Sequence, residues 1–574
     1  MEELKKYIVS NIKEVLNKEY ELEMSNEEIY NALEKPKNEN MGDISYPCFR
    51  LSKVLKNSPV NIATEINTKL ILDNNKITKV EVVAGYLNFY INNTYITNKI
   101  VSNIMNSKEK YGYKNIGNNQ NITIDYSSPN IAKPFHLGHL RTTIIGRSLY
   151  NLYNELGYNC IGINHLGDWG RQFGLLIEGY RRFKDEYNDL ETDALHVLAD
   201  IYTRINSLAK EDETIFDIAR ENFKKLEEGD KELLAKWQYF KDISLKEYER
   251  IYKILGCKFD SYNGEAFYND KMDEVIQILD KKGVLVESQG AKVVEIGENE
   301  PPCLIVKSNG STIYATRDLA AILYRSRTYD YVKSIYVTGY EQIHHFNQVF
   351  KVATHLVDEK YSKDLVHVPY GMVRLKTGKM SSREGTLIYL QDLIEEAIKR
   401  SKAIIEEKSN DIENIDDLAR DIGVGALVFN DLKHNKIKDV IFDLDECLRF
   451  DGETGPYVQY TYARICSLIS KSDLKIDNIK IGNYEYNGIE TKLIKLLDNF
   501  ENIIKDAAEQ YEPAILTRYL IDVASIFSTF YNSNKVLNVE DIKTKEARLM
   551  LAYITGIVIK KGLKILGINA PSQM

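Results

Sequence analysis

The sequence predicts a multidomain α/β protein: a doubly wound parallel sheet with insertions, preceded by a small α+β domain and followed by an all-α bundle. Three observations predict this. The first hundred residues combine helix and strand patterns. Strand and helix patterns then alternate from residue 121 to about 450, which is typical of a parallel sheet. From about residue 455 apolar residues recur with helical spacing, which predicts a bundle.

The overall numbers exclude several protein classes. A chain of 574 residues is long enough for several domains with cores of their own. Its net charge of −9 argues against a protein that coats nucleic acid non-specifically, although a local basic groove stays open. The six cysteines form no CxxC pair, so we expect neither a zinc site nor a disulfide framework. With no signal-peptide pattern and no membrane-length apolar stretch, a cytoplasmic protein is expected.

The first domain is predicted over residues 1–106. An apolar helical face runs through Leu4, Ile8 and Ile12. Residues 40–47 form a turn-rich segment that leads into a helix near Phe49, and residues 80–91 read as strands around a turn. The polar stretch from residue 107 to 121 marks the boundary to the next domain.

The second domain, predicted over residues 120–450, is organised around its first strand, loop and helix. Ile122, Ile124 and Tyr126 alternate with polar residues, as in a strand. Residues 127–135 are rich in turn formers, and from Leu140 the apolar spacing is helical. Open α/β sheets hold nucleotides in this layout, where a strand ends and a helix begins.

His136, Gly138 and His139 open the predicted helix. The two histidines share a face in a first helical turn, where unpaired N–H groups and the helix dipole favour phosphates. Gly138 lets a ligand approach the backbone. Two imidazoles that donate hydrogen bonds suit a displacement at phosphorus, because negative charge builds on the leaving diphosphate. The alternative is a helix start with two exposed histidines.

A second motif is the glycine-bounded loop of residues 374–385, which carries several basic residues, among them Lys379 and Arg383. Such a run is usually a solvated turn. Because it is paired with the earlier histidines, we interpret it instead as a mobile loop that closes on a bound triphosphate.

The rest of the domain continues the alternation. A second strand precedes residues 165–174, where Asp168 could cap a helix that begins at Trp169 or the glycines could simply make the turn, and no catalytic role is assigned. Charged helices follow from about 178 to 255. A hairpin is predicted around the Asn309-Gly310 turn, with strands 303–307 and 312–315. The last predicted elements are a strand (334–338), a helix (342–355) and a strand (366–375).

These motifs carry a family resemblance. Residues 130–139 and the Lys379–Arg383 loop resemble the paired signatures of class I aminoacyl-tRNA synthetases, and the Ser-Ser-Pro-Asn run before the first signature resembles the arginyl-tRNA synthetases. Further matching motifs extend from the first domain to the last residues, so the resemblance covers nearly the whole chain. It implies a Rossmann-like catalytic domain, an N-terminal domain that touches the tRNA and, over residues 455–574, an anticodon-binding bundle.

The resemblance also assigns residues. The catalytic residues would be His136, His139, Lys133, Lys379 and Arg383, and the ATP-binding residues would be His136, Gly138, His139, Lys379, Met380, Ser381 and Ser382. The chain departs from the common signature at Ser382, where a lysine is usual. Arginyl enzymes without that lysine carry one just before the histidines, so Lys133 is expected to neutralise phosphate charge in its place.

The implied arginine pocket has two parts. Ser127, Asn130 and His139 would face the amino and carboxylate groups. The guanidinium would face Glu265, Tyr314, Asp318 and Gln342. A planar group with several N–H donors requires carboxylates and planar acceptors in a fixed fork. For each residue the alternative is an ordinary surface polar group.

Two further features have modest interpretations. His344 and His345 are adjacent and point apart on any regular element, which favours a structural reading over a metal site. At the start of the bundle, stacking on unpaired bases is possible for Tyr457, Tyr460, Tyr462 and Arg464, although aromatic core packing is the more common role.

The implied activity is arginine–tRNA ligation: ATP activates L-arginine as arginyl-adenylate, diphosphate leaves, and arginine passes to the 3′-terminal adenosine of tRNA(Arg). Mg²⁺ would accompany ATP, and no protein-bound zinc, DNA partner or membrane partner is expected. A monomer is expected. Two alternatives stay open, a small-molecule ligase or nucleotidylyltransferase that uses the same nucleotide site, and a non-catalytic RNA-binding paralogue.

Overall fold

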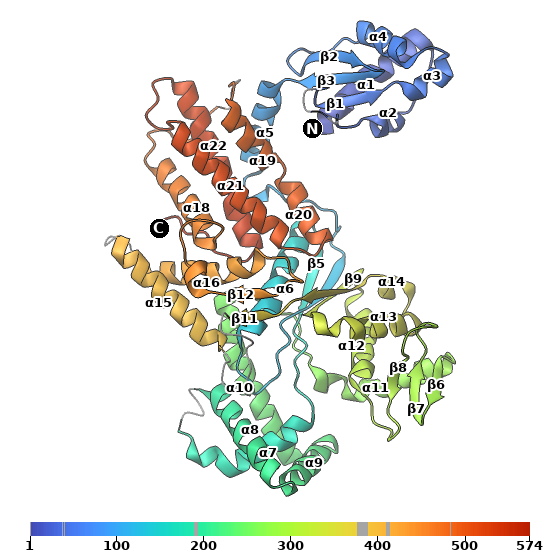
Figure 1. The fold of residues 1–574 in the computed structure, drawn as a ribbon, viewed down its shortest axis with the longest axis vertical. Coiled ribbons are helices and arrows are strands. Elements are labelled where there is room, and N and C mark those ends of the chain that lie inside the picture. Colours follow the sequence, from blue (N-terminus) through green and yellow to red (C-terminus); the bar gives the residue numbers. More distant parts are fainter. Residues whose placement is uncertain are drawn as a thin grey trace. The chain divides into compact units, whose positions relative to one another are not determined.

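The computed structural model describes residues 2–36, 38, 41–188, 193–375, 388–408, 414–480, 482 and 484–574. The chain forms two compact units, whose helices and strands are labelled in Figure 1. The first contains residues 1–111, 468–499 and 525–557, and the second contains residues 112–467, 500–524 and 558–574. Each unit therefore combines segments that are distant in the sequence, and each is described separately below.

The N-terminal part of the first unit packs helices on a small antiparallel sheet. Its strand order is β1-β3-β2. The predicted apolar face of the first helix is buried, with Ile8 and Ile12 fully inaccessible. The turn-rich segment before Phe49 contains a strand, β1, which the sequence did not predict. The elements are α1 (Glu2–Tyr20), α2 (Asn26–Ala32), β1 (Ile44–Pro47), α3 (Phe49–Leu55), α4 (Pro59–Lys69), β2 (Ile77–Val83), β3 (Tyr86–Ile91) and α5 (Asn93–Ser107).

The later segments of the first unit are helical. The Tyr111 hydroxyl donates to the Leu497 carbonyl at 3.0 Å, which joins α19 (Gly488–Asp498) to the chain just after α5. An ion pair of 2.7 Å between Arg548 and the buried Glu490 joins α19 to the first part of α22 (Ile542–Ile565). These contacts place helices from both ends of the sequence in one unit.

The second unit is built on a four-stranded parallel sheet of order β10-β9-β4-β5. The first strand in sequence, β4, lies between β5 and β9, so the strand order reverses beside it. Open α/β sheets bind ligands at such a point. The elements are β4 (Asn121–Asp125), α6 (Leu137–Glu155), β5 (Asn159–Ile163), α12 (Tyr314–Tyr329), β9 (Lys333–Gly339), α13 (Ile343–Leu356), α14 (Glu359–Ser362) and β10 (Leu365–Tyr370).

Two insertions separate β5 from β9. The first is the predicted run of charged helices: α7 (Arg171–Phe183), α8 (Ala194–Glu211), α9 (Thr214–Glu227) and α10 (Lys231–Leu255). The second contains α11 (Met272–Lys281), β6 (Leu285–Ser288), β7 (Ala291–Val294) and β8 (Cys303–Val306).

The predicted hairpin at Asn309-Gly310 is wrong in its second strand. The turn forms, since the Lys307 N–H donates to the Ser311 carbonyl at 2.9 Å, but only one bridge, Val306 to Thr312, follows it. β8 pairs with β7, and Tyr314 already starts α12. The pattern of the four residues 312–315 is compatible with a short strand or with the first turn of a helix. The helix forms because it buries the apolar face of α12.

The predicted strand over residues 366–375 is also corrected, because it is two strands in different sheets. β10 ends at Tyr370, and β11 (Val373–Leu375) pairs with β12 (Val440–Phe442) instead. Gly371 lies between them, and a Cβ there would come within 2.6 Å of the Ile437 carbonyl oxygen. The remaining helices of this unit include α15 (Leu390–Lys408), α16 (Ile415–Leu432), α17 (Leu444–Cys447), α18 (Gly455–Ser470), α20 (Phe500–Glu509) and the first half of α21 (Ala514–Ser533).

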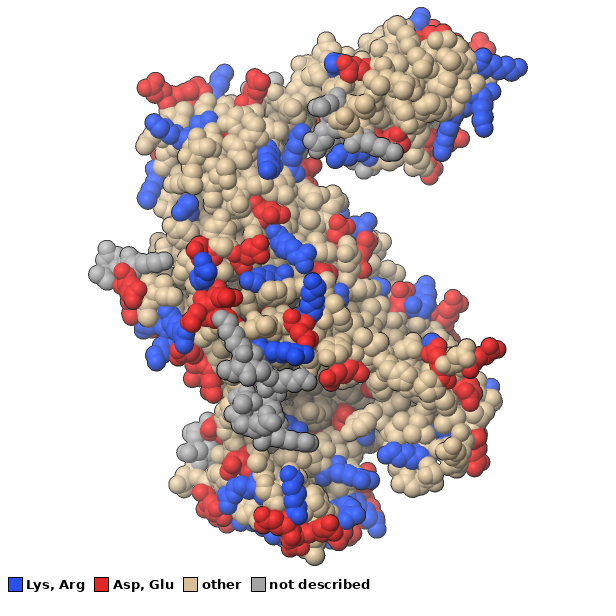
Figure 2. Space-filling view, in the orientation of Figure 1, with Lys and Arg blue, Asp and Glu red and all other residues tan. Residues whose placement is uncertain are grey.

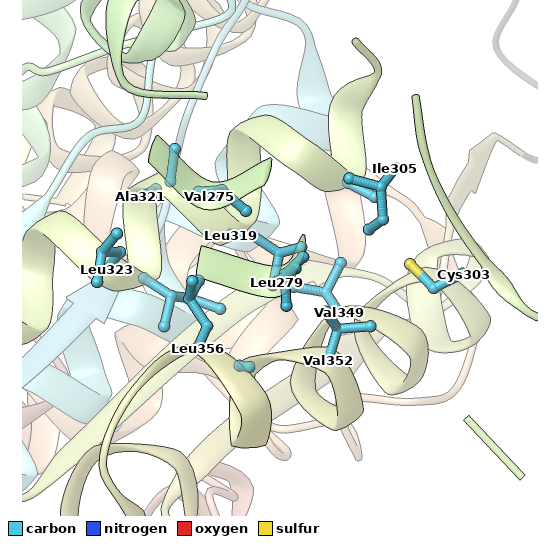
Figure 3. Packing of buried hydrophobic residues seen from close by; sticks show 14 of the residues in the cluster. Val275, Leu279, Cys303, Ile305, Leu319, Ala321, Leu323, Val349, Val352 and Leu356 are labelled. Atoms are coloured by element: carbon cyan, nitrogen blue, oxygen red, sulfur yellow. The ribbon is translucent and has the colours of Figure 1, made fainter. Parts of the chain in front are cut away.

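A hydrophobic core fixes α12 and α13 next to the sheet. Leu319 of α12 and Val349 of α13 are fully buried and pack with residues of α11 and β8 (Figure 3). Because both helices begin close to the carboxyl ends of strands, this core determines where their first-turn side chains lie.

Candidate active site

The loop after β4 is held in an unusual backbone conformation. Ser127, Ser128 and Ala132 have positive φ values of 70°, 46° and 59°. Non-glycine residues rarely adopt this region, and such strain is retained where surrounding contacts over-determine it. The Ser127 hydroxyl lies 2.8 Å from the Tyr252 hydroxyl and 2.8 Å from Thr143 Oγ1. These contacts fix the predicted residue Ser127 below the start of α6.

Asn130 lies next to the second glycine-rich segment. It forms a parallel bridge with Gly167, and its carbonyl accepts a 2.7 Å hydrogen bond from Tyr248 of α10. The Asn130 side chain is exposed. The sequence assigned no role to Gly167, but in the structure a Cβ at this position would come within 1.9 Å of Asn130 Oδ1. Glycine therefore leaves room for the Asn130 side chain in this position.

His136 and His139 cap the start of α6. His136 Nδ1 accepts from the Gly138 N–H at 3.1 Å, and His139 Nδ1 accepts from the His136 N–H at 3.2 Å. The ring centroids lie 3.9 Å apart, so the predicted shared face is present. A Cβ on Gly138 would come within 2.8 Å of the His136 ring. The glycine therefore makes room for the capping imidazole.

These contacts determine the protonation state of both rings. A nitrogen that accepts a hydrogen bond carries no proton, so the proton of each neutral ring is on Nε2. Burial, and then the charge of Lys133, lowers the pKa of His136 to about 4. Burial is also the main cause that lowers the pKa of His139 well below its usual value, followed by His136 and Lys133. The helix start thus presents two neutral imidazoles with Nε2–H donors.

Lys133 is exposed, and its charge acts on both histidines. Its ammonium lies 5.9 Å from the ring centroid of Tyr202 in the helical insertion. The Tyr248 hydroxyl donates to the Lys133 carbonyl at 2.7 Å, so the backbone of the residue is fixed while its side chain is accessible.

Figure 2 shows basic and acidic residues interspersed over the insertion helices α7–α9 at the bottom of the view.

Residues 376–385 of the predicted basic loop, with Lys379, Met380, Ser381, Ser382 and Arg383, lie outside the described residues, whereas Arg374 belongs to β11. The chain that follows the loop contacts the start of α6 beside the histidines. The sequence did not predict this contact. The Leu137 N–H donates to the Ile388 carbonyl at 3.1 Å, the Leu390 N–H donates to the Phe135 carbonyl at 2.9 Å, and Tyr389 forms an antiparallel bridge with His136. The described chain after the loop is therefore anchored at the helix start.

A pair of carboxylates forms the second part of the candidate site. Burial raises the pKa of Glu265 to about 7, while Arg317 Nη1, 3.6 Å from Glu265 Oε2, acts to lower it. The charge of Asp318 raises that pKa further, and Asp318 follows Arg317 directly in α12, so both acids lie beside this turn of the helix. Asp318 Oδ2 lies 2.6 Å from His345 Nε2. The structure therefore brings together the two predicted acidic residues.

Tyr314 and Gln342 are more peripheral. Tyr314 is 65% exposed at the first turn of α12, and Gln342 is exposed at the end of the 3₁₀ turn Tyr340–Gln342. Within the described part of the chain, neither side chain hydrogen-bonds to Glu265 or Asp318. Tyr314 shares the first turns of α12 with Asp318, as their spacing predicts.

Asp168 does not cap a helix at Trp169, so that prediction is wrong. α7 begins at Arg171, with Gly170 as its N-cap. Asp168 is fully buried; its carboxylate accepts from the Ala266 N–H at 2.8 Å and pairs with Lys241 at 2.7 Å. These partners are distant in sequence, which explains why a local reading missed them. Asp168 thereby fixes the backbone next to Glu265.

A buried ion pair supports the loop from below. Asp125, at the end of β4, binds Arg325 of α12 at 2.7 Å, and the Arg325 side chain is 1% exposed. The second Asp125 oxygen accepts from the Ser128 hydroxyl at 2.8 Å, and Ser128 Oγ in turn accepts from the His165 N–H at 3.1 Å. The pair is thus connected to the strained loop.

We expect Arg325→Met to lower the free energy of unfolding of this unit by about 3–5 kcal/mol, because it leaves the Asp125 charge buried and unpaired. Urea unfolding followed by tryptophan fluorescence measures this, since both tryptophans, Trp169 and Trp237, belong to this unit. The control is Arg327→Met. Arg327 pairs with Glu274 on the surface at 2.9 Å, and its loss should cost less than about 1 kcal/mol. Equal effects of the two substitutions would contradict the prediction.

Among the described residues, no three histidine, cysteine, aspartate or glutamate side chains gather as a possible metal site. None of the helices described is both long and apolar enough to cross a membrane. Of the aromatic residues at the start of the bundle, Tyr460 is 36% exposed, with its ring centroid 4.9 Å from the Arg464 guanidinium, whereas Tyr457 is half-buried.

Comparison with known proteins agrees with this geometry. Residues 100–444 match the family described as "tRNA synthetases class I (R), catalytic domain". Residues 2–91 match the arginyl tRNA synthetase N-terminal domain, and residues 458–574 match the DALR anticodon binding domain. A curated arginine–tRNA ligase of Clostridium beijerinckii is 46% identical over 569 residues, covering 98% of this chain and 99% of that protein. One of Clostridium botulinum is 46% identical over 575 residues, covering 99% and 100%.

Solved structures give the same result for the fold. The chain resembles an arginyl-tRNA synthetase of Thermus thermophilus with a TM-score of 0.78 and 22% identity, covering 100% of both chains. For that of Plasmodium falciparum the TM-score is 0.75 with 26% identity, covering 100% of this chain and 99% of the other. The fold, the paired histidines at the head of α6 and the full-length sequence match together place the chain in the arginyl-tRNA synthetase family, the class I ligases that use ATP to attach arginine to tRNA.

Proposed function

We propose that the helix start, Lys133 and the carboxylate pair carry out the first step of arginine–tRNA ligation. The α-carboxylate of arginine attacks the α-phosphorus of ATP, the bond to the bridging oxygen breaks, and diphosphate leaves. A hydroxyl of the terminal adenosine of tRNA(Arg) then attacks the arginyl carbonyl, and AMP leaves. Positioning and charge stabilisation supply the catalysis, and no protein nucleophile is needed.

The observation that carries this proposal is the pair of neutral imidazoles. Their Nε2–H groups can donate to phosphate oxygens, and we assign Gly138, which has no side chain, to ATP contact at the same helix start. Lys133, Lys379 and Arg383 would neutralise the triphosphate, and Met380, Ser381 and Ser382 would contact ATP. Mg²⁺ would arrive bound to the triphosphate, and we assign no protein group to it.

The arginine pocket would use both parts of the site. Ser127, Asn130 and His139 would face the amino and carboxylate groups of the substrate. The guanidinium would face a fork made by four residues, which are Glu265, Tyr314, Asp318 and Gln342. Two neighbouring carboxylates support this assignment, because a guanidinium presents donors along two edges and carries the compensating charge.

The tRNA would contact both ends of the chain. We assign residues 1–106 to the body of the tRNA and residues 455–574 to its anticodon, with residues 120–450 as the catalytic domain. We also propose a cytoplasmic monomer, and six cysteines without disulfide bonds support a reducing compartment.

Arginine-dependent exchange of diphosphate into ATP tests the function, measured with and without tRNA(Arg). Exchange only with the tRNA present would mean that the tRNA completes the active site. Exchange with arginine alone would retain the ligase and remove any need for that assembly. Absence of exchange under both conditions would contradict the proposal and favour a non-catalytic RNA-binding protein.

The pKa of Glu265 gives a pH prediction. Burial raises this pKa to about 7, and a bound guanidinium would lower it, because an opposite charge favours the ionised form. Arginine binding should therefore release protons near neutral pH. Its dissociation constant should rise as the pH falls below about 7, by up to about tenfold per unit.

Calorimetry in buffers of different ionisation enthalpy measures the proton release. Glu265→Gln removes the titrating group and should abolish that release, while the dissociation constant becomes less dependent on pH. If wild-type protein binds arginine without releasing protons at pH 7, Glu265 does not face the guanidinium.

A further inference from the structure

His345 makes a contact that the proposed reaction does not yet use. Its Nε2 lies 2.6 Å from Asp318 Oδ2. Asp318 is in the second turn of α12, and His345 is in the first turn of α13. The two side chains are each about 30% exposed, at 28% and 30%, so the pair lies at an accessible edge of the site.

The direction of this hydrogen bond follows from the chemistry of the two groups. An ionised carboxylate can only accept, so His345 Nε2 carries the proton and donates. The bond occupies one oxygen of Asp318 and fixes the plane of the carboxylate. Within the described part of the chain the other oxygen, Oδ1, has no hydrogen-bond partner, and it can accept from a ligand.

The identity of the donor matters for a cationic ligand. Arginine or lysine at this position would bring a permanent positive charge and cancel the charge that attracts a guanidinium. An imidazole N–H holds the carboxylate without a permanent charge. The two acids of the site therefore have different supports, since Glu265 faces Arg317 at 3.6 Å whereas Asp318 is held by a histidine.

The surrounding packing makes His345 a rigid support. The next residue, Phe346, is buried and stacks on the ring of His367 of β10 with centroids 4.8 Å apart. The helices that carry the pair share one core, in which Leu319 follows Asp318 directly and Val349 lies one turn after His345 (Figure 3). Neither helix can shift without disturbing this core.

We propose that His345 is a positioning residue for arginine recognition, which orients the Asp318 carboxylate so that Oδ1 meets the guanidinium. This inference rests on the proposed role of Asp318. Of the two adjacent histidines, only His345 is given a function. His344 is exposed on another face of α13.

The test is steady-state diphosphate exchange by the full-length enzyme with tRNA(Arg) present. His345→Ala should raise KM for arginine about tenfold or more, as expected for a lost charge-assisted hydrogen bond, with little change in kcat or in KM for ATP. His345→Gln can place an N–H donor near the position of Nε2 and should restore most of the lost affinity. His344→Ala is the matched control and should leave all three constants unchanged.

Each outcome is decisive. If His345→Ala lowers kcat and raises both KM values together, or if glutamine gives no rescue in a protein that melts at the wild-type temperature, the residue does not position Asp318. Asp318→Asn separates this result from a failure of the proposed pocket. If Asp318→Asn leaves KM for arginine unchanged, the pocket assignment itself is wrong, and the inference about His345 is wrong with it.

Discussion

Replacing His139 with alanine is expected to lower kcat for arginine-dependent diphosphate exchange by about 10²–10³-fold, the usual cost of losing one donor to a developing negative charge. The neutral ring offers its Nε2–H to the site, because Nδ1 accepts from the His136 N–H. Alanine removes both the donor and this cap. The measurement is exchange at saturating arginine and ATP, with binding of each substrate measured separately.

His355→Ala is the control for this prediction, since His355 lies in the last turn of α13 and not at the start of α6. It should exchange diphosphate at the wild-type rate. The pH dependence offers a second check. Burial, followed by the charge of Lys133, lowers the pKa of His136 to about 4, and burial lowers that of His139 well below its usual value, so both rings are expected to stay neutral as the pH falls from 8 through the usual histidine range. A decrease in kcat with an apparent pKa near 6.5 that disappears in His139→Ala would contradict the neutral-donor assignment.

The local features of this site could be predicted from the sequence because they depend on neighbouring residues. The strand, loop and helix follow from period and turn residues, and the shared face of His136 and His139 follows from their spacing. The parallel sheet was predictable for the same reason, since its strands alternate with helices. The structure confirms both predictions.

The features that were missed depend on residues far apart in sequence. Asp168 suggested a helix cap, but its carboxylate partners, Lys241 and Ala266, come from α10 and the following turn. Tyr252, which holds Ser127, also belongs to α10. No sequence pattern identifies such partners, because a tyrosine or lysine on an amphipathic helix looks like any other until the helix is placed. The residues that hold the site in place could therefore not be predicted, although several residues of the site itself could.

Lys133→Ala is the second substitution with a large expected effect. We expect it to lower kcat for diphosphate exchange by about 10²–10³-fold, while arginine still binds with nearly wild-type affinity in the absence of ATP. Lys133 is exposed beside the helix start, and its charge already lowers the pKa values of both histidines. That same charge is available to the triphosphate, and Ser382 stands where related loops carry a second lysine.

Two variants make the Lys133 prediction specific. Lys133→Arg keeps the positive charge and should retain much of the activity, whereas Lys210→Ala, at an exposed lysine of α8, should have no effect. If Lys133→Ala exchanges diphosphate at a nearly normal rate, the charge must come from another residue. If it loses arginine binding as well, Lys133 supports the pocket and not the phosphates. Loss of exchange with arginine binding intact is expected only if Lys133 acts on the nucleotide, because the carboxylates that would hold the guanidinium belong to α12 and the turn after α10.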